Sequence, residues 1–227
     1  MNRKHLSTWC VTTLMLVISV VTEAREVPLI DAVKNGDKVA VGTLLTRKAD
    51  VNSPEADGTT ALHWAVHRDD LQTADLLIRS GANVGAANRY GVTPVSIACT
   101  NGSAAMIERL LGAGADPNTA LPDGETVLMT AARTGTTDAV KALLAHGANV
   151  NAREPAKGQT ALMWAAAEDN AAVVKLLAEA GGDLQARSKV GAFTPLMFAV
   201  RGGHLETTRA LLDAGANVNT MLPDGTS

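Results

Sequence analysis

Residues 57–66 read Asp-Gly-Thr-Thr-Ala-Leu-His-Trp-Ala-Val, and residues 76–84 read Leu-Leu-Ile-Arg-Ser-Gly-Ala-Asn-Val. Close variants of both stretches recur along the chain. A Thr returns at intervals of 33 or 34 residues, and a Gly follows each copy 21 residues later. The five pairs are Thr60 and Gly81, Thr93 and Gly114, Thr126 and Gly147, Thr160 and Gly181, and Thr194 and Gly215. Such a period predicts a stack of repeated structural units.

Each repeat predicts a first short helix that begins at its Thr. Thr60 stands where an N-cap residue belongs, because its hydroxyl can accept hydrogen bonds from backbone N–H groups two or three residues further on. Pro94 and Pro195 directly follow the Thr in two copies and suit the first helical turn. An apolar stripe with helical spacing follows, formed in one copy by Leu62, Ala65 and Val66. The end of this helix is marked by Gly36, Gly102, Gly135 and Gly203 in four copies and by Asp69 and Asp169 in two.

A second helix and a loop complete each unit. Val140, Leu143 and Leu144 form the apolar face of one such helix, and Gly147 follows where a left-handed residue is favoured. A turn-forming segment comes next, and the loop closes at Gly58, Gly91, Gly124, Gly158, Gly191 and Gly225. Each unit is therefore expected to contain two antiparallel helices and an extended loop.

The pattern Asp-Gly-x-Thr-Pro-Leu-His-x-Ala, followed by Leu-Leu-x-x-Gly-Ala-Asn-Val-Asn, resembles the ankyrin repeat family over about residues 27–227. The resemblance implies an all-α solenoid of antiparallel helix pairs with β-hairpin finger loops. The expected ankyrin repeat domain is 25–227, with an N-capping repeat at 27–56, repeats from 57, 90, 123, 157 and 191, and the start of a seventh at 224–227. The first copy carries Asp31 where later copies have Trp64, Ile97, Trp164 or Phe198, as a solvent-facing cap requires.

Two irregularities fall in the loops and at the end of the chain. Single-residue insertions before Gly158 and after Gly191 lie in finger loops, where they leave the stack undisturbed. Residues 222–225 match residues 121–124, so residues 226–227 should open a further inner helix. The apolar face of Leu205, Leu211 and Leu212 would otherwise meet water. We therefore expect the native polypeptide to continue beyond residue 227.

Residues 1–24 lie outside the repeat and match a secretory signal peptide. Basic residues 3–5 precede an apolar run at 11–21, and cleavage is expected after Ala24. The run is shorter than the roughly 20 apolar residues that cross a bilayer. Bulky Trp9 disfavours a lipoprotein at Cys10, and a retained anchor is the minor alternative. The expected location is therefore periplasmic or secreted, without membrane attachment after cleavage.

The mature chain is mildly acidic and has one cysteine. Its 203 residues include 18 basic and 22 acidic side chains, a net charge of about −4, which gives no general reason to expect nucleic acid or a membrane as partner. Cys99 has no second cysteine to pair with, so packing alone must stabilise the fold.

Some residues that could carry chemistry are better explained by structure. His63 and His67 have a spacing that can chelate zinc, but the first occupies a structural hydrogen-bonding position of the family that the chain resembles. A copper(I) site at Met129, Met163 and Met197 would need residues of successive repeats to share one ion, so core packing is favoured.

The two candidate nucleophiles are also better explained by structure. Cys99 falls on the core stripe, and Ser96 lacks flanking glycines and a histidine partner. We therefore expect no metal, no cofactor and no enzymatic activity.

The family's usual binding surface is the concave face, formed by finger loops and the exposed side of the first helices. Basic side chains gather at these positions, against Glu125, Glu154 and Glu168. The resemblance thus places candidate partner-binding residues at His67, Arg68, Arg89, Tyr90, Arg133, Arg153, Lys157, Arg187, Lys189, Phe193 and Arg201. An acidic protein segment is the expected partner, with Tyr90 and Phe193 as aromatic anchors. The alternative is an ordinary solvated surface.

The resulting functional hypothesis is an exported, monomeric ankyrin-repeat scaffold for protein–protein interaction. One alternative is that it is the recognition portion of a longer enzyme or effector whose catalytic domain lies beyond residue 227. Another is a metal-handling periplasmic protein.

Overall fold

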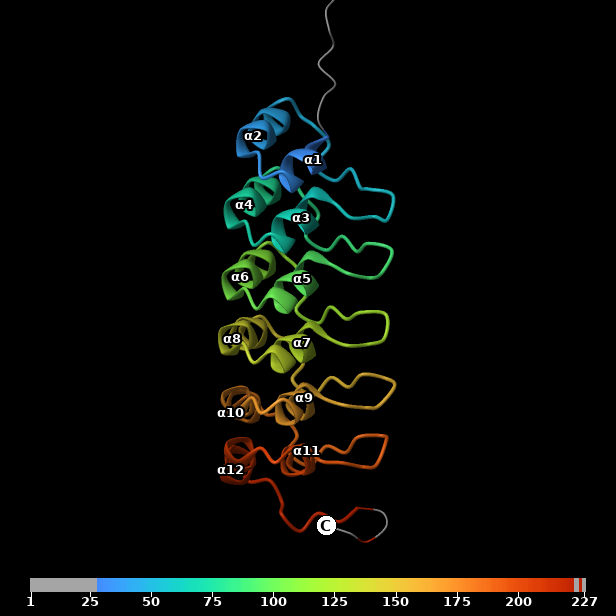
Figure 1. Ribbon diagram of the computed structural model, residues 1–227, viewed down its shortest axis with the longest axis vertical. Coiled ribbons are helices and arrows are strands. Elements are labelled where there is room, and N and C mark those ends of the chain that lie inside the picture. The colour runs from blue at the N-terminus through green and yellow to red at the C-terminus, as the bar shows by residue number, and fades with distance from the viewer. Residues whose placement is uncertain (1–27, 223–224, 226–227) are drawn as a thin grey trace, which may run out of the picture.

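The computed structural model describes residues 28–222 and Gly225. Twelve helices in this part of the chain form six antiparallel pairs that stack in chain order into a column (Figure 1). The pairs are α1 (Leu29–Lys34) with α2 (Lys38–Thr46), α3 (Ala61–His67) with α4 (Leu71–Arg79), α5 (Pro94–Asn101) with α6 (Ala104–Gly112), α7 (Val127–Thr134) with α8 (Thr137–Ala145), α9 (Ala161–Ala167) with α10 (Ala171–Glu179), and α11 (Pro195–Gly202) with α12 (Leu205–Asp213). The predicted all-α solenoid is confirmed.

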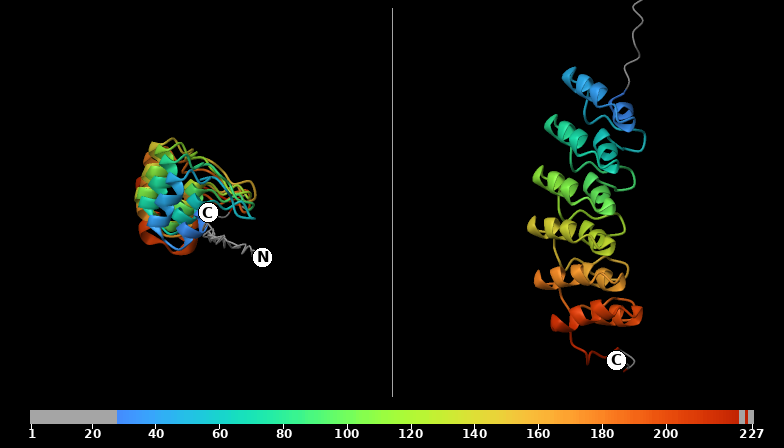
Figure 2. Two further views of the ribbon diagram at one scale, coloured as in Figure 1. Left: turned by 90° about the horizontal axis from the view of Figure 1, so that it is seen from above. Right: turned by 60° about the vertical axis from the view of Figure 1, so that its left-hand side comes forward.

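The column has two layers of helices and one row of loops. Odd-numbered helices, here called inner helices, lie beside the loops, and even-numbered outer helices lie on the far side (Figure 1). Seen along the column, all loops project to the same side (Figure 2). We call them fingers 1 to 5, at residues 53–59, 86–92, 119–125, 152–159 and 186–193.

The inner helices begin and end where the sequence predicts. The N-cap residues of α3, α5, α7, α9 and α11 are Thr60, Thr93, Thr126, Thr160 and Thr194. In α7 the Thr126 hydroxyl accepts a hydrogen bond from the Met129 backbone N–H at 3.3 Å. After the inner helices the backbone turns left-handed, with φ of 68° at Gly102 and 52° at Asp69. Glycine adopts this conformation without strain, and aspartate tolerates it better than most residues.

A column of small side chains lets the inner helices pack closely. The residue five positions after each N-cap is alanine and is 0% exposed; the five are Ala65, Ala98, Ala131, Ala165 and Ala199. Leucines fill the space around this column, and Leu62, Leu128 and Leu162 are buried. Trp64, Trp164 and Phe198 are partly buried against the core, as expected for residues that pack between repeats.

The fingers turn back like hairpins but form no regular strands in the residues described. Two backbone hydrogen bonds close finger 1, from Glu55 N–H to the Thr59 carbonyl at 2.8 Å and from Gly58 N–H to the Glu55 carbonyl at 2.9 Å. The strand-like pairing found across residues 28–222 is one isolated antiparallel bridge between Ala120 and Thr126. The β-hairpin fingers implied by the family resemblance are therefore tight loops, because their arms are too short for a ladder.

Backbone hydrogen bonds join neighbouring fingers in two places. Arg89 N–H donates to the Asp57 carbonyl at 2.7 Å, and Lys189 N–H donates to the Lys157 carbonyl at 2.7 Å. Pro122 and Pro155 have no N–H to donate, and their rings pack against the glycines at the tips of fingers 2 and 3. Fingers 1 and 2 are therefore joined through their backbones, and so are fingers 4 and 5.

The two ends of the column differ in polarity. Asp31 is exposed at the N-terminal end, as expected for a capping repeat. At the other end Leu205 is 67% and Leu212 is 40% exposed, as predicted, but Leu211 is 0% exposed because it faces its own repeat. The prediction that Leu211 would meet water was therefore wrong.

Two sequence predictions cannot be compared with this structure. The signal peptide predicted at 1–24 lies outside the described residues, as do Asp224, Thr226 and Ser227 of the expected seventh copy. Within the described part, no helix is both long enough and apolar enough to cross a bilayer.

Candidate protein-binding face

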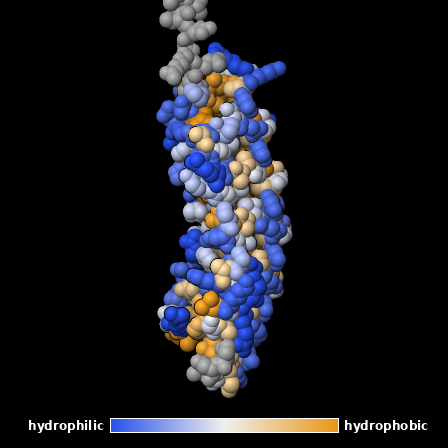
Figure 3. All heavy atoms as spheres, turned by 90° about the vertical axis from the view of Figure 1, so that its right-hand side faces the viewer, coloured by the Kyte–Doolittle hydropathy of each residue, from blue (hydrophilic) through white to orange (hydrophobic). Residues whose placement is uncertain are grey.

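The candidate site is the side of the column that carries the fingers. We define the binding face as fingers 1 to 5 together with the exposed residues of the inner helices. This side is largely hydrophilic, with hydrophobic residues toward both ends of the column (Figure 3). Two residues at the C-terminal end of each inner helix from α3 to α11 are exposed; they are His67, Arg68, Thr100, Asn101, Arg133, Thr134, Ala167, Glu168, Arg201 and Gly202.

Some of these positions connect successive repeats. The Arg68 guanidinium donates to the Lys34 carbonyl at 3.0 Å, at the end of the preceding inner helix. Asn101 donates in the same way to the Val66 carbonyl at 3.0 Å. Sequence reasoning missed this role, although both residues lie at the same position in their repeats. Arg68 is therefore a structural link as well as a surface cation.

The N-terminal part of the face presents one aromatic side chain to solvent. Tyr90, at the tip of finger 2, is 60% exposed. The Arg89 guanidinium lies over its ring, 5.2 Å from the centroid. His67 makes an edge-to-face contact with Trp64, with the ring centroids 5.8 Å apart. The structure thus leaves Tyr90 available as an anchor.

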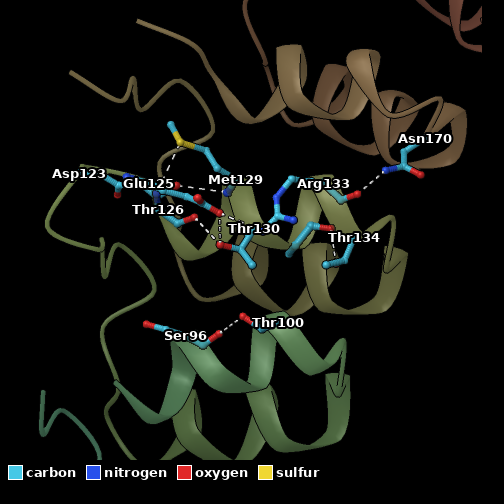
Figure 4. A network of polar contacts seen from close by, with 11 residues as sticks. Ser96, Thr100, Asp123, Glu125, Thr126, Met129, Thr130, Arg133, Thr134 and Asn170 are labelled. Carbon is cyan, nitrogen blue, oxygen red and sulfur yellow. Dashed lines mark hydrogen bonds and ion pairs between the residues drawn. The ribbon is translucent and has the colours of Figure 1, made fainter. Parts of the chain in front are cut away.

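A polar network occupies the middle of the face (Figure 4). The Thr130 hydroxyl donates to the Glu125 carboxylate at 2.7 Å. Arg133 reaches the same carboxylate at 3.5 Å, the long limit of a hydrogen bond. Glu125 and Arg133 therefore partly neutralise each other.

Four cations gather on fingers 4 and 5, namely Arg153, Lys157, Arg187 and Lys189, and the first and last of them link the two loops. Arg153 donates to the Arg187 carbonyl, and Lys189 donates to the Pro155 carbonyl at 2.6 Å. Arg187 in turn donates to the Met221 carbonyl at 3.0 Å. These acceptors are neutral, so the hydrogen bonds leave the positive charges in place. None of Arg153, Lys157, Arg187 and Lys189 forms a salt bridge with another described residue.

Glu154, expected as an exposed counter-charge on this face, is instead buried. It is 6% exposed, and its carboxylate accepts hydrogen bonds from the backbone N–H groups of Ala156, Lys157 and Gln159 at 2.8–2.9 Å. Burial acts to raise the pKa of Glu154, but these hydrogen bonds outweigh it and hold the pKa below its ordinary value. Glu154 stays ionised, but the exposed charged side chains of fingers 4 and 5 are all cations.

The aromatic residue of finger 5 is less available than Tyr90. Phe193 is half-buried and packs against Phe198, with ring centroids 5.8 Å apart. The Arg201 guanidinium lies 5.6 Å from its centroid. Phe193 also lines a cavity of about 430 Å³ at the C-terminal end of the column. It belongs to the edge of the core as much as to the surface.

The candidate metal ligands and the candidate nucleophile Cys99 have structural roles. The Nδ1 of His63 accepts from Thr60 N–H at 3.1 Å, and its Nε2 lies 3.1 Å from the Val92 carbonyl, so both ring nitrogens are in use. In α7 the Met129 sulfur takes the place of the His63 Nδ1 and accepts a hydrogen bond from Thr126 N–H at 3.5 Å. Cys99 is fully buried, and burial raises its pKa to about 12, which disfavours the reactive thiolate.

Stacked helix pairs with loops projecting to one side define a tandem-repeat scaffold. A family model described as ankyrin repeats in three copies matches residues 29–121, 101–188 and 128–222, and the chain belongs to the ankyrin repeat family. Among solved structures, the human ASB11 ankyrin repeat domain is similar. It is 29% identical, the match covers 88% of this chain and 89% of that chain, and the TM-score is 0.77. No curated protein gives a significant match.

Domains of this family are generally scaffolds that bind other proteins. The fold does not select the partner, because 630 chains of solved structures match it.

Proposed function

We propose that this protein is an exported, monomeric, non-catalytic scaffold that binds an acidic segment of another protein through its binding face. The supporting observation is the set of four cations on fingers 4 and 5 that form no salt bridge with a described residue, with the carboxylate of Glu154 turned inward beneath them. An acidic partner segment would associate faster and more specifically with this cationic surface.

The charge distribution supports the binding face over the outer helices. The outer helices carry six acidic residues, Asp75, Glu108, Asp138, Glu179, Glu206 and Asp213, and six basic ones, Lys38, Arg79, Arg109, Lys141, Lys175 and Arg209, so their charges balance. The chain as a whole is mildly acidic, so general electrostatic attraction would not bring an acidic partner to it. Recognition must therefore use the local excess of cations.

The test is binding of a defined acidic probe, an acetylated and amidated hexaglutamate peptide. We expect Lys157→Glu/Arg201→Glu to weaken binding at least tenfold, because it reverses two charges on the face without removing an arginine or lysine that links fingers. Lys141→Glu/Lys175→Glu is the matched control, with the same charge change on α8 and α10, and should bind normally. Equal loss in both variants, or equal binding of hexaglutamine, would contradict the proposal.

Export is tested separately. Amino-terminal sequencing of the protein recovered outside the cytoplasm of its native host should begin at Arg25. Recovery of the uncleaved chain in the cytoplasm would contradict the proposed location.

A further inference from the structure

Tryptophan occupies equivalent positions in α3 and α9, four residues after the N-cap Thr. In the first of these sites the indole has an acceptor, since Trp64 Nε1–H donates to the Glu55 carboxylate at 2.7 Å. The same carboxylate pairs with Lys34, whose ammonium lies over the Trp64 ring, 4.4 Å from the centroid. The indole N–H of Trp64, the carboxylate of Glu55 and the ammonium of Lys34 thus satisfy one another within the protein.

The second site keeps the N–H and the cation but lacks the acceptor. Arg133 lies over the Trp164 ring, 5.7 Å from the centroid, in the position that Lys34 takes over Trp64. Trp164 Nε1 is buried and has no hydrogen-bond partner in the described part of the chain. Burying an N–H without an acceptor is unfavourable, so an acceptor supplied by a partner would be stabilised there.

The missing acceptor is explained by one inserted residue. Glu154 corresponds to Glu55, but it precedes Trp164 by ten positions, whereas Glu55 precedes Trp64 by nine. In the longer loop the Glu154 carboxylate turns back onto finger 4 and accepts the N–H groups of Lys157 and Gln159 at 2.9 Å. The insertion has therefore freed the indole of Trp164.

A cavity of about 180 Å³ lies beside Trp164, lined also by acidic residues that are already hydrogen-bonded. Glu154 is bound by its own finger, Glu125 by the Thr130 hydroxyl, and the Asp123 carboxylate by the Glu125 N–H at 3.0 Å. Lys157, which also lines the cavity, has no salt bridge to any described residue. Together with Arg133, which reaches Glu125 only at 3.5 Å, Lys157 is available to an incoming anion.

We propose that the cavity beside Trp164 binds a carboxylate side chain of the acidic partner segment, in the position that Glu55 has beside Trp64. The incoming carboxylate accepts from Trp164 Nε1–H and pairs with Arg133. Because Nε1 is enclosed, binding requires a bordering side chain to rotate, and Arg133 is half-exposed and weakly held. This inference rests on the proposed function and specifies which group of the partner enters which site.

The indole N–H signals of the full-length protein provide a direct measurement. In ¹H–¹⁵N spectra, assigned with the single variants Trp64→Phe and Trp164→Phe, we titrate the hexaglutamate peptide. The Trp164 indole proton should move downfield and saturate, while the Trp64 signal, already bonded to Glu55, should stay in place. Saturable binding that leaves the Trp164 signal unmoved would overturn the inference.

Affinities of three variants complete the test. Trp164→Phe keeps the ring but removes the donor and should weaken peptide binding about tenfold, whereas the matched Trp64→Phe should bind within about twofold of the parent. Deletion of Ala156 restores the loop length of finger 1, so Glu154 should become the acceptor and the peptide response of Trp164 should disappear. An unchanged affinity for Trp164→Phe, or an unchanged response after the deletion, would refute this site while leaving the proposed function intact. Absence of any peptide binding would refute both.

Discussion

At the residue scale, one glycine replaces an asparagine that links neighbouring repeats elsewhere. The Asn52 amide donates to the Gly81 carbonyl at 3.0 Å and its oxygen accepts from Asn83 N–H at 2.7 Å. Asn118 and Asn151 make the same pair of bonds. Gly85 stands at this position in the second repeat, so the link to the third repeat is missing there.

Gly85→Asn should therefore stabilise the protein. Gly85 does not have a positive φ, and a Cβ there would meet its nearest atom, Asn83 Oδ1, at 3.6 Å, so a side chain fits. Gly85→Ala is the control, because it gives the same loss of unfolded-state freedom without the hydrogen bonds. We expect the free energy of unfolding in urea to be about 1 kcal/mol higher for Asn than for Ala. Equal values would show that the asparagine link contributes nothing.

The titration of His63 predicts a pH dependence of stability. Burial lowers the pKa of His63 below 6.5, against the opposing effect of hydrogen bonds to the Val92 and Ala86 backbone. As pH falls below about 6.5, the unfolded chain therefore binds more protons than the folded protein. The stability that neutral His63 contributes is lost in that range. His63→Met, which places at α3 the residue found at Met129, should show a smaller loss between pH 7.5 and 5.5 in urea unfolding. Parallel pH profiles would contradict this assignment.

At the element scale, each inner helix depends on the repeat that follows it. Val66 in α3 is fully buried, while Val200, at the same position of α11, is 59% exposed. Val66→Ala should lower the free energy of unfolding by about 2 kcal/mol through lost burial and a cavity, and Val200→Ala by less than about 0.5 kcal/mol. Urea unfolding of the two variants measures this difference. Similar costs would mean that Val200 is covered in solution.

The sequence could predict features that arise within one helix or turn, but not the side-chain contacts that depend on loop geometry. N-caps such as Thr60 and left-handed residues such as Asp69 act through local backbone chemistry, so a repeated pattern reveals them. The directions of long side chains depend on loop geometry. One inserted residue turns Glu154 inward while Glu55 reaches Trp64, and the links made by Arg153 and Lys189 require the neighbouring finger. The candidate face was therefore predictable as a surface, but the contacts within it were not.

At the scale of the whole molecule, stability and recognition use different parts of one repeating plan. The buried alanine column and the capped helices recur in every repeat from the second onward, which makes a rigid scaffold. The fingers and exposed inner-helix positions vary, and the cations concentrate on fingers 4 and 5. Departures from the repeat therefore carry the recognition that we propose.

Chemical-shift mapping of the full-length protein with the hexaglutamate peptide tests this claim most directly. The account predicts that saturable backbone amide shifts concentrate in fingers 4 and 5 and along α7, α9 and α11, and weaken with salt as charge pairs are screened. Shifts centred on the outer helices, or no saturable shifts at low salt, would contradict it.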